Sequence, residues 1–382
     1  MVTTRYIIFG LGLFFLGGVF SPAAADMRVH ADSTTKPPGT WQLFPEANVH
    51  GPLVHAPIGV MADHPHHKGE FMLSLRYMGM YMDGMADGTN SIAASKVTDP
   101  ASYDYLVSPT NMTTQMLMFG AMWAPVDEVT LVLMLPYLFK DMDHVVGQGM
   151  AAGQKFTTRA NGVGDLSAAA MVPIVRNEKQ LLQLNIGWGF PTGSIDETDN
   201  NPLSDMMLMG EVRLPYPMQL GSGSFEFRPG VVYRHMVFDH VGLGIQGTAR
   251  IRLNENSNHY RLGEEYEVTA WSAFEVLQFL SASFRLAWKQ RFNIHGRDPA
   301  IMTRSMMPGL MGKKTVPTAF PDNQGSRRLY GFWGINLWAP QKKGFLRGHR
   351  LAIEVGFPFW QSVDGPQLKD RVMGTVGWQY SF

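Results

Sequence analysis

The 382-residue chain contains no cysteine, so it can form neither a disulfide framework nor a thiolate metal site. It also lacks a charge surplus, because 32 basic side chains balance 32 acidic ones, and this gives no indication of nucleic acid as a partner. After the first 25 residues, no stretch approaches the roughly 18 uninterrupted apolar residues that a membrane-spanning helix needs. The composition therefore excludes helical membrane spans in the rest of the chain.

The first 25 residues have the pattern of an export signal. Arg5 precedes an apolar run from Ile7 to Phe20, and small residues end the segment at Ala25. We expect a signal peptide over residues 1–25 that is cleaved after Ala25. A retained membrane anchor fits less well, because the run contains glycines and is shorter than the ~20 residues of a spanning helix. Cleavage removes one basic residue and no acidic residue.

Alternation at every second residue is the strongest pattern in the chain. In the closing segment, one face carries Val372, Gly374, Val376, Trp378, Tyr380 and Phe382, and the other carries Arg371, Met373, Thr375, Gly377, Gln379 and Ser381. A strand with lipid on one side and a polar lumen on the other must change character at every residue. The terminal aromatic Phe382 is similar to the signal that the barrel-assembly machinery recognises.

Twelve segments show this alternation, and the connections between them are alternately long and short. They are 70–82, 111–123, 128–140, 162–176, 179–192, 224–236, 240–253, 265–276, 279–292, 327–339, 349–360 and 370–382. Bacterial barrels have long extracellular loops and short periplasmic turns. We therefore predict an all-β fold, a single closed antiparallel transmembrane β-barrel of about 12 strands over residues 69–382. Its predicted location is the outer membrane of a Gram-negative bacterium, with both ends in the periplasm.

Residues 26–68 are rich in proline, glycine and histidine and do not alternate. They form either a disordered periplasmic arm or a partial plug that folds into the barrel, and the sequence leaves both open. This segment contains the close group His64, His66 and His67, preceded by His50 and His55. Imidazole nitrogens at this density could coordinate copper or another borderline metal, although the spacing matches no defined zinc signature.

Methionine is concentrated in one part of the chain, because 12 of its 26 methionines lie between Met61 and Met142. The alternation turns nine of them into the lumen: Met72, Met78, Met80, Met82, Met112, Met116, Met118, Met122 and Met134. Thioether sulfur is a soft donor suited to Cu(I), and methionine is also an adaptable lining for apolar molecules and a filler of gaps. Metal contact, passage of apolar solutes and structural filling all stay open.

Charged side chains are assigned to the same inner face. The predicted lumen charges are Arg76, Asp165, Glu226, Arg228, Arg250, Arg252, Glu265, Glu267, Arg285, Glu354 and Arg371. Because both signs are present, we expect ion pairs that brace a constricted lumen.

Several glycine-rich stretches carry a resemblance to a known family. They are Gly162-Val163-Gly164-Asp165-Leu166, Gly189-Phe190-Pro191-Thr192-Gly193-Ser194, Leu220-Gly221-Ser222-Gly223-Ser224 and the closing Gly377-Trp378-Gln379-Tyr380-Ser381-Phe382. Over residues 56–382 the chain resembles the outer-membrane proteins grouped as the meta-pathway phenol-degradation, or transporter, family. The resemblance implies a barrel in the outer membrane with a role in uptake or transport, and it carries over no catalytic residues.

These patterns predict an outer-membrane channel or transporter for small solutes, with a lumen lined by methionine and histidine that suggests copper binding or passage. The alternatives are uptake of small apolar or aromatic compounds, a structural or adhesive barrel and, least favoured, an outer-membrane phospholipase-like enzyme. An enzyme is not expected, because no Gly-x-Ser-x-Gly elbow occurs. The expected partners are outer-membrane lipid, the barrel-assembly machinery and a small-molecule or metal-ion solute, and copper is the one cofactor suggested.

Overall fold

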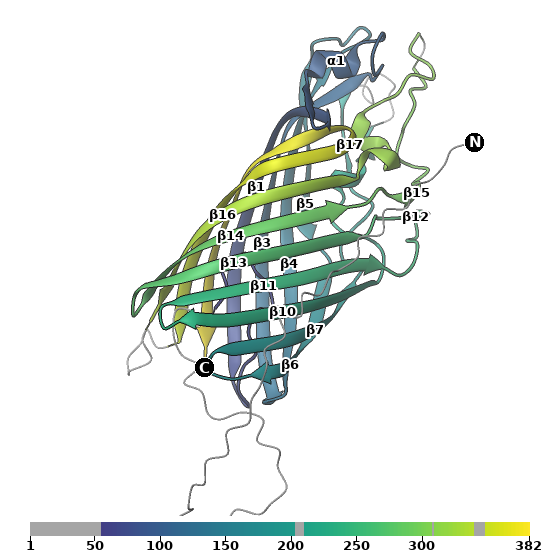
Figure 1. Ribbon diagram of the computed structural model, residues 1–382. Coiled ribbons are helices and arrows are strands. Elements are labelled where there is room, and N and C mark those ends of the chain that lie inside the picture. Colours follow the sequence, from purple (N-terminus) through teal and green to yellow (C-terminus); the bar gives the residue numbers. More distant parts are fainter. Residues whose placement is uncertain (1–54, 203–209, 308, 340–347) are drawn as a thin grey trace, which may run out of the picture. The chain divides into compact units, whose positions relative to one another are not determined.

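The computed structural model describes residues 55–382 except 203–209, 308 and 340–347. The predicted signal peptide and residues 26–54 of the predicted arm lie outside the described residues. The described chain is nearly all β, and its strands form one closed antiparallel barrel (Figure 1). None of its helices is both long enough and apolar enough to cross a membrane.

The barrel is built from long strands that follow one another in the sheet in chain order. Besides β17 (His349–Ser381), they are β1 (Phe71–Gly88), β3 (Val107–Val126), β4 (Val129–Val146), β6 (Leu166–Arg176), β7 (Gln180–Phe190), β10 (Glu226–Phe238), β11 (Val241–Arg252), β13 (Glu265–Leu277), β14 (Leu280–Arg291) and β16 (Ser326–Trp338). Pairing of β17 with β1 closes the sheet, so the barrel has no open edge. All twelve predicted segments lie within or overlap these strands.

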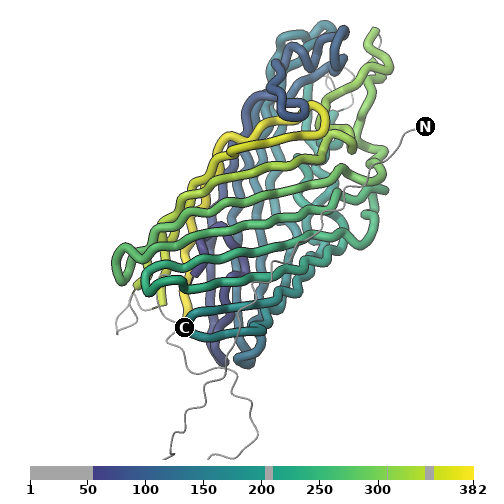
Figure 2. The backbone as a smooth tube through the Cα atoms, in the orientation of Figure 1, coloured from purple at the N-terminus to yellow at the C-terminus, as the bar shows by residue number. Residues whose placement is uncertain are grey.

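The last strand, β17, supplies two crossings of the barrel. Its first part, Arg350–Val363, pairs with β16, and its second part, Val363–Ser381, pairs with β1. Two residues after the shared Val363, Gly365 has φ +72°, a left-handed conformation that glycine adopts without strain. Figure 2 shows the yellow, C-terminal part of the chain reversing its direction. With the two arms of β17 counted separately, the prediction of about 12 strands is confirmed.

One end of the barrel carries both the start of β1 and the chain's C-terminus. The amide of Phe71 donates to the carbonyl of Phe382 over 2.9 Å. Short turns such as that between Val126 and Val129 lie at this end, and the long connections lie at the other (Figure 1). The alternation of loop length predicted from the sequence is therefore present.

The long connections contain short elements of their own. These are β2 (Asn90–Ile92), α1 (Ala94–Thr98), β5 (Lys155–Val163), β8 (Thr198–Asp199), β9 (Val212–Arg213), η1 (Tyr216–Met218), β12 (Tyr260–Arg261), β15 (His295–Gly296), η2 (Pro317–Ala319) and η3 (Pro321–Asn323). The expected loops 83–110 and 141–161 are shorter than the sequence suggested. In the structure β1, β3 and β4 continue into them, and β5 extends the pairing of β4.

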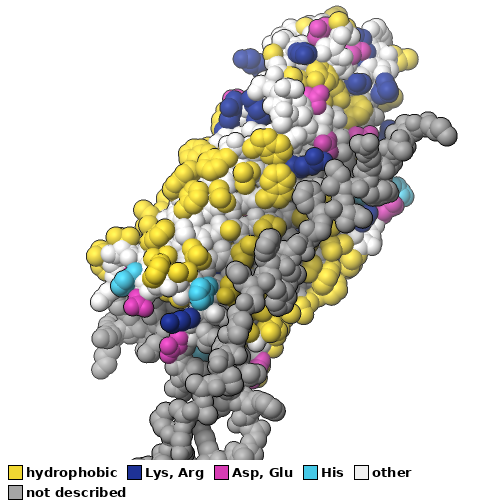
Figure 3. Space-filling model, in the orientation of Figure 1, with side chains coloured by type: hydrophobic (Ala, Val, Ile, Leu, Met, Phe, Trp, Pro, Cys, Tyr) yellow, Lys and Arg dark blue, Asp and Glu magenta, His cyan; other side chains and the backbone are white. Residues whose placement is uncertain are grey.

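The outer face of the barrel is apolar. On β1, Leu73 and Leu75 are 46% and 38% exposed, whereas the flanking inward positions Met72 and Arg76 are 1% and 3% exposed. Figure 3 shows apolar side chains over the visible face of the barrel, with lysines, arginines and acids mostly toward its ends. Stacked rings of Trp123, Phe71 and Phe382 lie at the end with the terminus. Such an aromatic border is typical of the membrane interface.

Candidate functional site in the lumen

Residues 55–68, here called the plug segment, lie inside the barrel. Arg350 of β17 donates through Nη2 to the Ala56 carbonyl over 2.7 Å. From β11, four strands away in the sheet, Gln246 donates through Nε2 to the Met61 carbonyl over 2.8 Å. The backbone amide of Gly59 donates to Glu354 of β17 over 3.3 Å. These partners come from distant strands, so the segment spans the lumen.

Two further strands hold the other half of the plug segment. The Ala62 carbonyl accepts hydrogen bonds from Gln183 and Asn185 of β7, over 2.9 and 3.0 Å. The His66 amide donates to Thr130 Oγ1 of β4 over 2.9 Å. In each of these hydrogen bonds the plug segment contributes a backbone group and the inner wall contributes a side chain. For residues 26–68, the sequence did not decide between a periplasmic arm and a partial plug. The described part, residues 55–68, adopts the plug form.

Apolar contacts fill the space between these hydrogen bonds. Ala56 and Val60 pack with Val232 of β10 and Trp271 of β13, and all four are buried. Interiors packed in this way leave little room for water. The barrel is therefore filled at the level of the plug segment.

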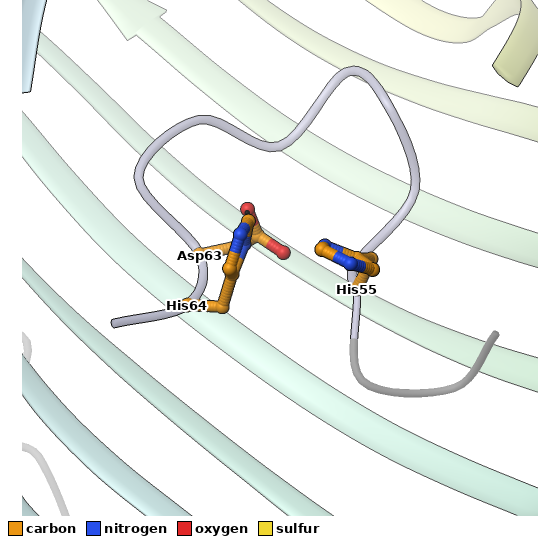
Figure 4. Close-up of side chains that lie close together, drawn as sticks. All are labelled: His55, Asp63 and His64. Carbon is orange, nitrogen blue, oxygen red and sulfur yellow. Dashed lines mark hydrogen bonds and ion pairs between the residues drawn. The ribbon is translucent and has the colours of Figure 1, made fainter. Parts of the chain in front are cut away.

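A group of titratable side chains lies within the plug segment itself. The potential ligand atoms of His55, Asp63 and His64 are all within 4.8 Å of one another, and all three residues are buried. Figure 4 shows His55 and Asp63 turned toward each other across the mouth of the loop that joins them, with His64 beside Asp63. The loop thus brings its two ends together at these residues.

The hydrogen bonds of this group leave imidazole nitrogens free. Asp63 accepts from the Ala56 amide at 2.7 Å and lies 2.9 Å from His64 Nδ1. His55 Nδ1 and His64 Nε2 are buried and have no hydrogen-bond partner among the described residues, and the same holds for His66 Nε2. The His64 ring centroid lies 4.2 Å from that of His55 and 5.0 Å from that of His66.

Burial sets the protonation of the two central imidazoles. It lowers the pKa of His55 well below its ordinary value and lowers the pKa of His64 as well. Neither belongs to a membrane-spanning strand. Both rings are therefore neutral at neutral pH, which is the form that binds metal ions.

The predicted histidine group was His64, His66 and His67, and the structure separates its members. His64 and His66 are buried with His55, whereas the His67 side chain is 41% exposed and lies 3.5 Å from Asp127. Sequence reasoning mentioned His55 as a neighbour but omitted Asp63 from the group. The adjacent Asp63-His64 pair was the available signal, because a carboxylate beside a histidine commonly orients the ring.

The predicted methionines fall into three environments. Met72, Met122 and Met134 pack together with Met171 against Ala62 of the plug segment. Met72 lies directly opposite Met122 in the antiparallel pairing of β1 with β3. This first group is closed off beneath the plug segment.

The second group lies toward the end with the long loops. Met82 and Met112 pack with the buried Met85, Met142 and Met218. Leucines from the loop after β9 and from β17 belong to the same apolar cluster, namely Leu214, Leu220 and Leu368. This cluster, here called the upper methionine cluster, provides thioethers in an apolar surrounding.

The third group lies between the other two and is only partly buried. Met78 lies opposite Met116, and Met118 lies opposite Arg76. Met80 lies opposite Met373 of β17. These methionines place their sulfur atoms toward the lumen. Metal binding by any of the nine predicted methionines stays a prediction.

The predicted lumen charges form ion pairs on neighbouring strands. Glu226 lies 2.6 Å from Arg228 and 3.0 Å from Arg252, and Arg252 lies 3.1 Å from Glu265. Arg250 also approaches Glu265, at 3.8 Å. These groups lie at the ends of β10, β11 and β13 that face the long loops.

A second group of charges lies beside the plug segment. Arg285 pairs with Glu354, and both are almost completely buried. Arg285 also lies 3.8 Å from Glu267. The buried Arg76 contacts the sulfur of Met61 through Nη1. Ion pairs therefore brace the inner wall at two levels.

Two of the predicted lumen charges are placed differently. Asp165 lies at the break between β5 and β6 and accepts from the amides of Gly193 and Ser222, over 3.0 and 2.8 Å. Arg371 lies where the register of β17 with β1 shifts, and its half-exposed side chain is 3.5 Å from Asp83. The neighbouring Asp370 is 2% exposed. The bulge breaks the alternation there, so the sequence pattern could not place Arg371 correctly.

A separate pocket lies among the long loops. Its apolar lining includes Phe156, Leu214, Ile301 and Val316, and His144 stacks on Phe156 with ring centroids 4.8 Å apart. Leu214 belongs both to this pocket and to the upper methionine cluster. An apolar region thus runs from the loop end of the molecule to the inner wall.

No protein-family model matches the sequence, and no curated protein matches it. Among solved structures, the chain is similar to an outer membrane channel from Pseudomonas putida F1, with a TM-score of 0.53 and 14% identity. The similarity covers 85% of this chain and 99% of that one. Membership of the meta-pathway family stays a prediction.

Two weaker similarities are to other outer-membrane proteins. The transport unit of the autotransporter AIDA-I from Escherichia coli gives a TM-score of 0.46 at 10% identity, covering 85% of this chain and 93% of that one. A Pseudomonas aeruginosa FadL homologue gives 0.35 at 9% identity, covering 82% and 90%. The strand pairing of the chain, together with the similarity to the Pseudomonas putida F1 channel, shows the fold of an outer-membrane β-barrel.

Proposed function

We propose that the protein is an outer-membrane channel for small solutes whose lumen is closed by the plug segment. The observation that carries this proposal is the set of hydrogen bonds between residues 56–66 and side chains of β4, β7, β11 and β17. The apolar outer face and the aromatic border suit a lipid bilayer. The alternating segment that ends at Phe382 suits recognition by the barrel-assembly machinery.

The barrel does not need the plug segment to close. Its sheet is complete through the pairing of β1 with β17, and the plug segment contributes no strand to it. Its backbone is held by separate hydrogen bonds, each worth about 1 kcal/mol net. A segment held in this way can leave, and a polar inner wall of arginine, glutamate and glutamine would remain. This is the arrangement of a gated channel.

Soft metal ions, copper in particular, are the solutes that we propose first. Met78 and Met116 lie opposite each other on adjacent strands and are only partly buried. Met118 lines a small cavity with Met61 and Ala62 of the plug segment. Thioethers bind Cu(I) in preference to hard cations. Successive sulfurs on adjacent strands would let an ion move between weak sites.

Small apolar or aromatic compounds are the second candidate. The apolar pocket among the long loops and the upper methionine cluster favour it, since they share Leu214. Methionine is an adaptable lining for such molecules. Both candidates use the same barrel and differ in which methionines would act.

Planar-bilayer conductance of the purified full-length protein tests the channel proposal. We expect brief, small openings for the native chain and a clearly higher, sustained conductance for a variant that lacks residues 55–64. Silence of both proteins, with each correctly folded, would contradict a channel.

Copper uptake into vesicles tests the solute. The pair Met78→Leu and Met116→Leu should reduce copper passage and leave the passage of a small neutral sugar unchanged. If uptake of an aromatic compound changed instead, the second candidate would be supported and the copper proposal would fail.

A further inference from the structure

All the members of the His55, Asp63 and His64 group belong to the plug segment, and none comes from a barrel strand. A metal ion held there would join the two ends of the loop between His55 and His64. It would not connect the plug segment to the inner wall. Such an ion would hold the plug segment in its folded form. This role differs from that of an ion that moves along the lumen methionines.

The distances suit an ion after small side-chain rotations. Donor atoms around a tetrahedral ion lie about 2.0–2.2 Å from the metal and therefore roughly 3.5 Å from one another. The ligand atoms of the group are already within 4.8 Å of one another. Rotation of the two imidazoles about their side-chain bonds covers the difference.

The unpartnered nitrogens provide an independent reason for a ligand. His55 Nδ1 and His64 Nε2 are buried without partners among the described residues, although buried polar groups in proteins are nearly always hydrogen-bonded. Leaving such a group unsatisfied destabilises the folded chain. An ion bound to His55 Nδ1 would remove this cost at that atom.

The surroundings hold the potential ligands in place. The Ala56 amide fixes one oxygen of Asp63, and the other oxygen lies beside His64 Nδ1. An ion bound by this oxygen and by His64 Nδ1, which lie 2.9 Å apart, would take the place of the hydrogen bond between them. His66, whose ring is 5.0 Å from that of His64, could supply a fourth donor through its free Nε2.

The donor set selects the class of ion. Two imidazole nitrogens and one carboxylate suit borderline divalent ions such as Cu²⁺, Ni²⁺ and Zn²⁺, whereas Cu(I) prefers sulfur. Arg76, Arg234 and Arg350 also interact electrostatically with Asp63 and oppose any cation. An ion that bonds strongly to imidazole tolerates this field best, and Cu²⁺ forms the strongest such bonds in the series.

We propose that the plug segment binds one borderline divalent metal ion through His55, Asp63 and His64, and that this ion keeps the segment folded inside the barrel. The second part rests on the proposed function, since it assumes that the plug segment closes a channel. Binding to the folded segment alone stabilises it in proportion to the logarithm of the free ion concentration. Removal of the ion would therefore increase the open fraction.

Metal titration of the purified full-length protein in detergent tests the site. After chelator treatment and dialysis, Cu²⁺ and Zn²⁺ are added separately, and calorimetry and elemental analysis give affinity and stoichiometry. We expect one equivalent per chain, with nitrogen hyperfine coupling in the Cu²⁺ electron paramagnetic resonance spectrum. His55→Gln and His64→Gln should each weaken binding by more than about a hundredfold.

Two histidine variants calibrate the result. His66→Gln should weaken binding less than the central variants do, and the exposed His67→Gln should leave it unchanged. Heat-modifiable migration on gels shows that each variant is folded. If a central variant does not fold, the comparison of native protein with and without chelator replaces it. No stoichiometric binding by the native protein, or equal binding by all variants, would overturn the site.

The same preparation in a planar bilayer separates this inference from the proposed function. We expect chelation to raise the conductance of the native protein and Cu²⁺ to lower it again. Tight metal binding in a protein that never conducts would leave the site standing and contradict the channel. Conductance that changes with neither chelator nor metal would support the channel and contradict the role of the ion.

Discussion

Gln246 of β11 donates a hydrogen bond to the carbonyl of Met61 over 2.8 Å, although the two residues are 185 positions apart in the chain. The bond joins the inner wall to the plug segment near the middle of that segment. Gln183 of β7 makes the equivalent bond to Ala62, the next residue. These two glutamines therefore hold the same short stretch of the plug segment from neighbouring parts of the wall.

Replacing Gln246 with leucine should favour release of the plug segment. Loss of one hydrogen bond of about 1 kcal/mol changes an equilibrium roughly fivefold, and the double variant with Gln183→Leu should show a larger effect. The measurement is the open fraction in single-channel records. Gln115→Leu is the matched control, because Gln115 accepts from Tyr77 on another part of the barrel. Equal records for Gln246→Leu and Gln115→Leu would count against these bonds as anchors.

A second prediction concerns Gly59. A Cβ atom at this position would overlap the guanidinium of Arg285 and the carboxylate of Glu354. Because that ion pair is buried, neither side chain can move away freely. We expect Gly59→Ala to loosen the plug segment and raise conductance. Gly79→Ala is the control, since a Cβ there would meet only atoms of Tyr77 at 3.7 Å or more. Unchanged conductance for Gly59→Ala would show that the space is larger than the structure indicates.

The buried pair Arg285–Glu354 should matter for stability. Glu354→Gln leaves the guanidinium of Arg285 largely uncompensated, and breaking a buried pair typically costs about 3–5 kcal/mol. Lys289→Gln removes a partner of Glu267 that is 44% exposed, and exposed pairs contribute only about 0–1 kcal/mol. Urea unfolding of the protein in lipid vesicles measures both. Similar losses for the two variants would contradict the burial of the first pair.

The methionines beneath the plug segment should behave as packing residues. Met72 is 1% exposed, so Met72→Ala should destabilise the barrel by about 2–5 kcal/mol. Met72→Leu should cost less than about 1.5 kcal/mol, because leucine and methionine have similar volumes. We also expect Met72→Leu to leave copper uptake unchanged. A fall in copper uptake as large as that for Met78→Leu would show that sulfur, and not volume, matters at this position.

The barrel was predictable from the sequence because a bilayer imposes a strict rule on it. Lipid on one side and a filled lumen on the other force alternation, and Leu73 and Leu75 show it beside Met72 and Arg76. Exceptions arise where a bulge breaks the alternation. Arg371 is such a case, and no local feature of its sequence marks the bulge.

The plug segment could not be placed in the same way. Residues 55–68 have no periodic pattern, and their partners, such as Gln246 and Arg350, lie far along the chain. The histidine group was found by composition, but only the folded loop brings His55 to Asp63 and turns His67 outward. Likewise, the alternation assigned Met82 and Met112 to the inner face, but it could not show that both are packed among loop residues.

Thiol accessibility at Val232 tests most directly whether the plug segment closes the lumen. Val232 is completely buried against Ala56 and Val60, and the chain has no cysteine of its own, so Val232→Cys introduces a single thiol. A charged thiol reagent added to the folded protein should react very slowly with it, and much faster when Gly59→Ala is added. Rapid modification in the otherwise native chain would show that the lumen is open at this level and would contradict the account.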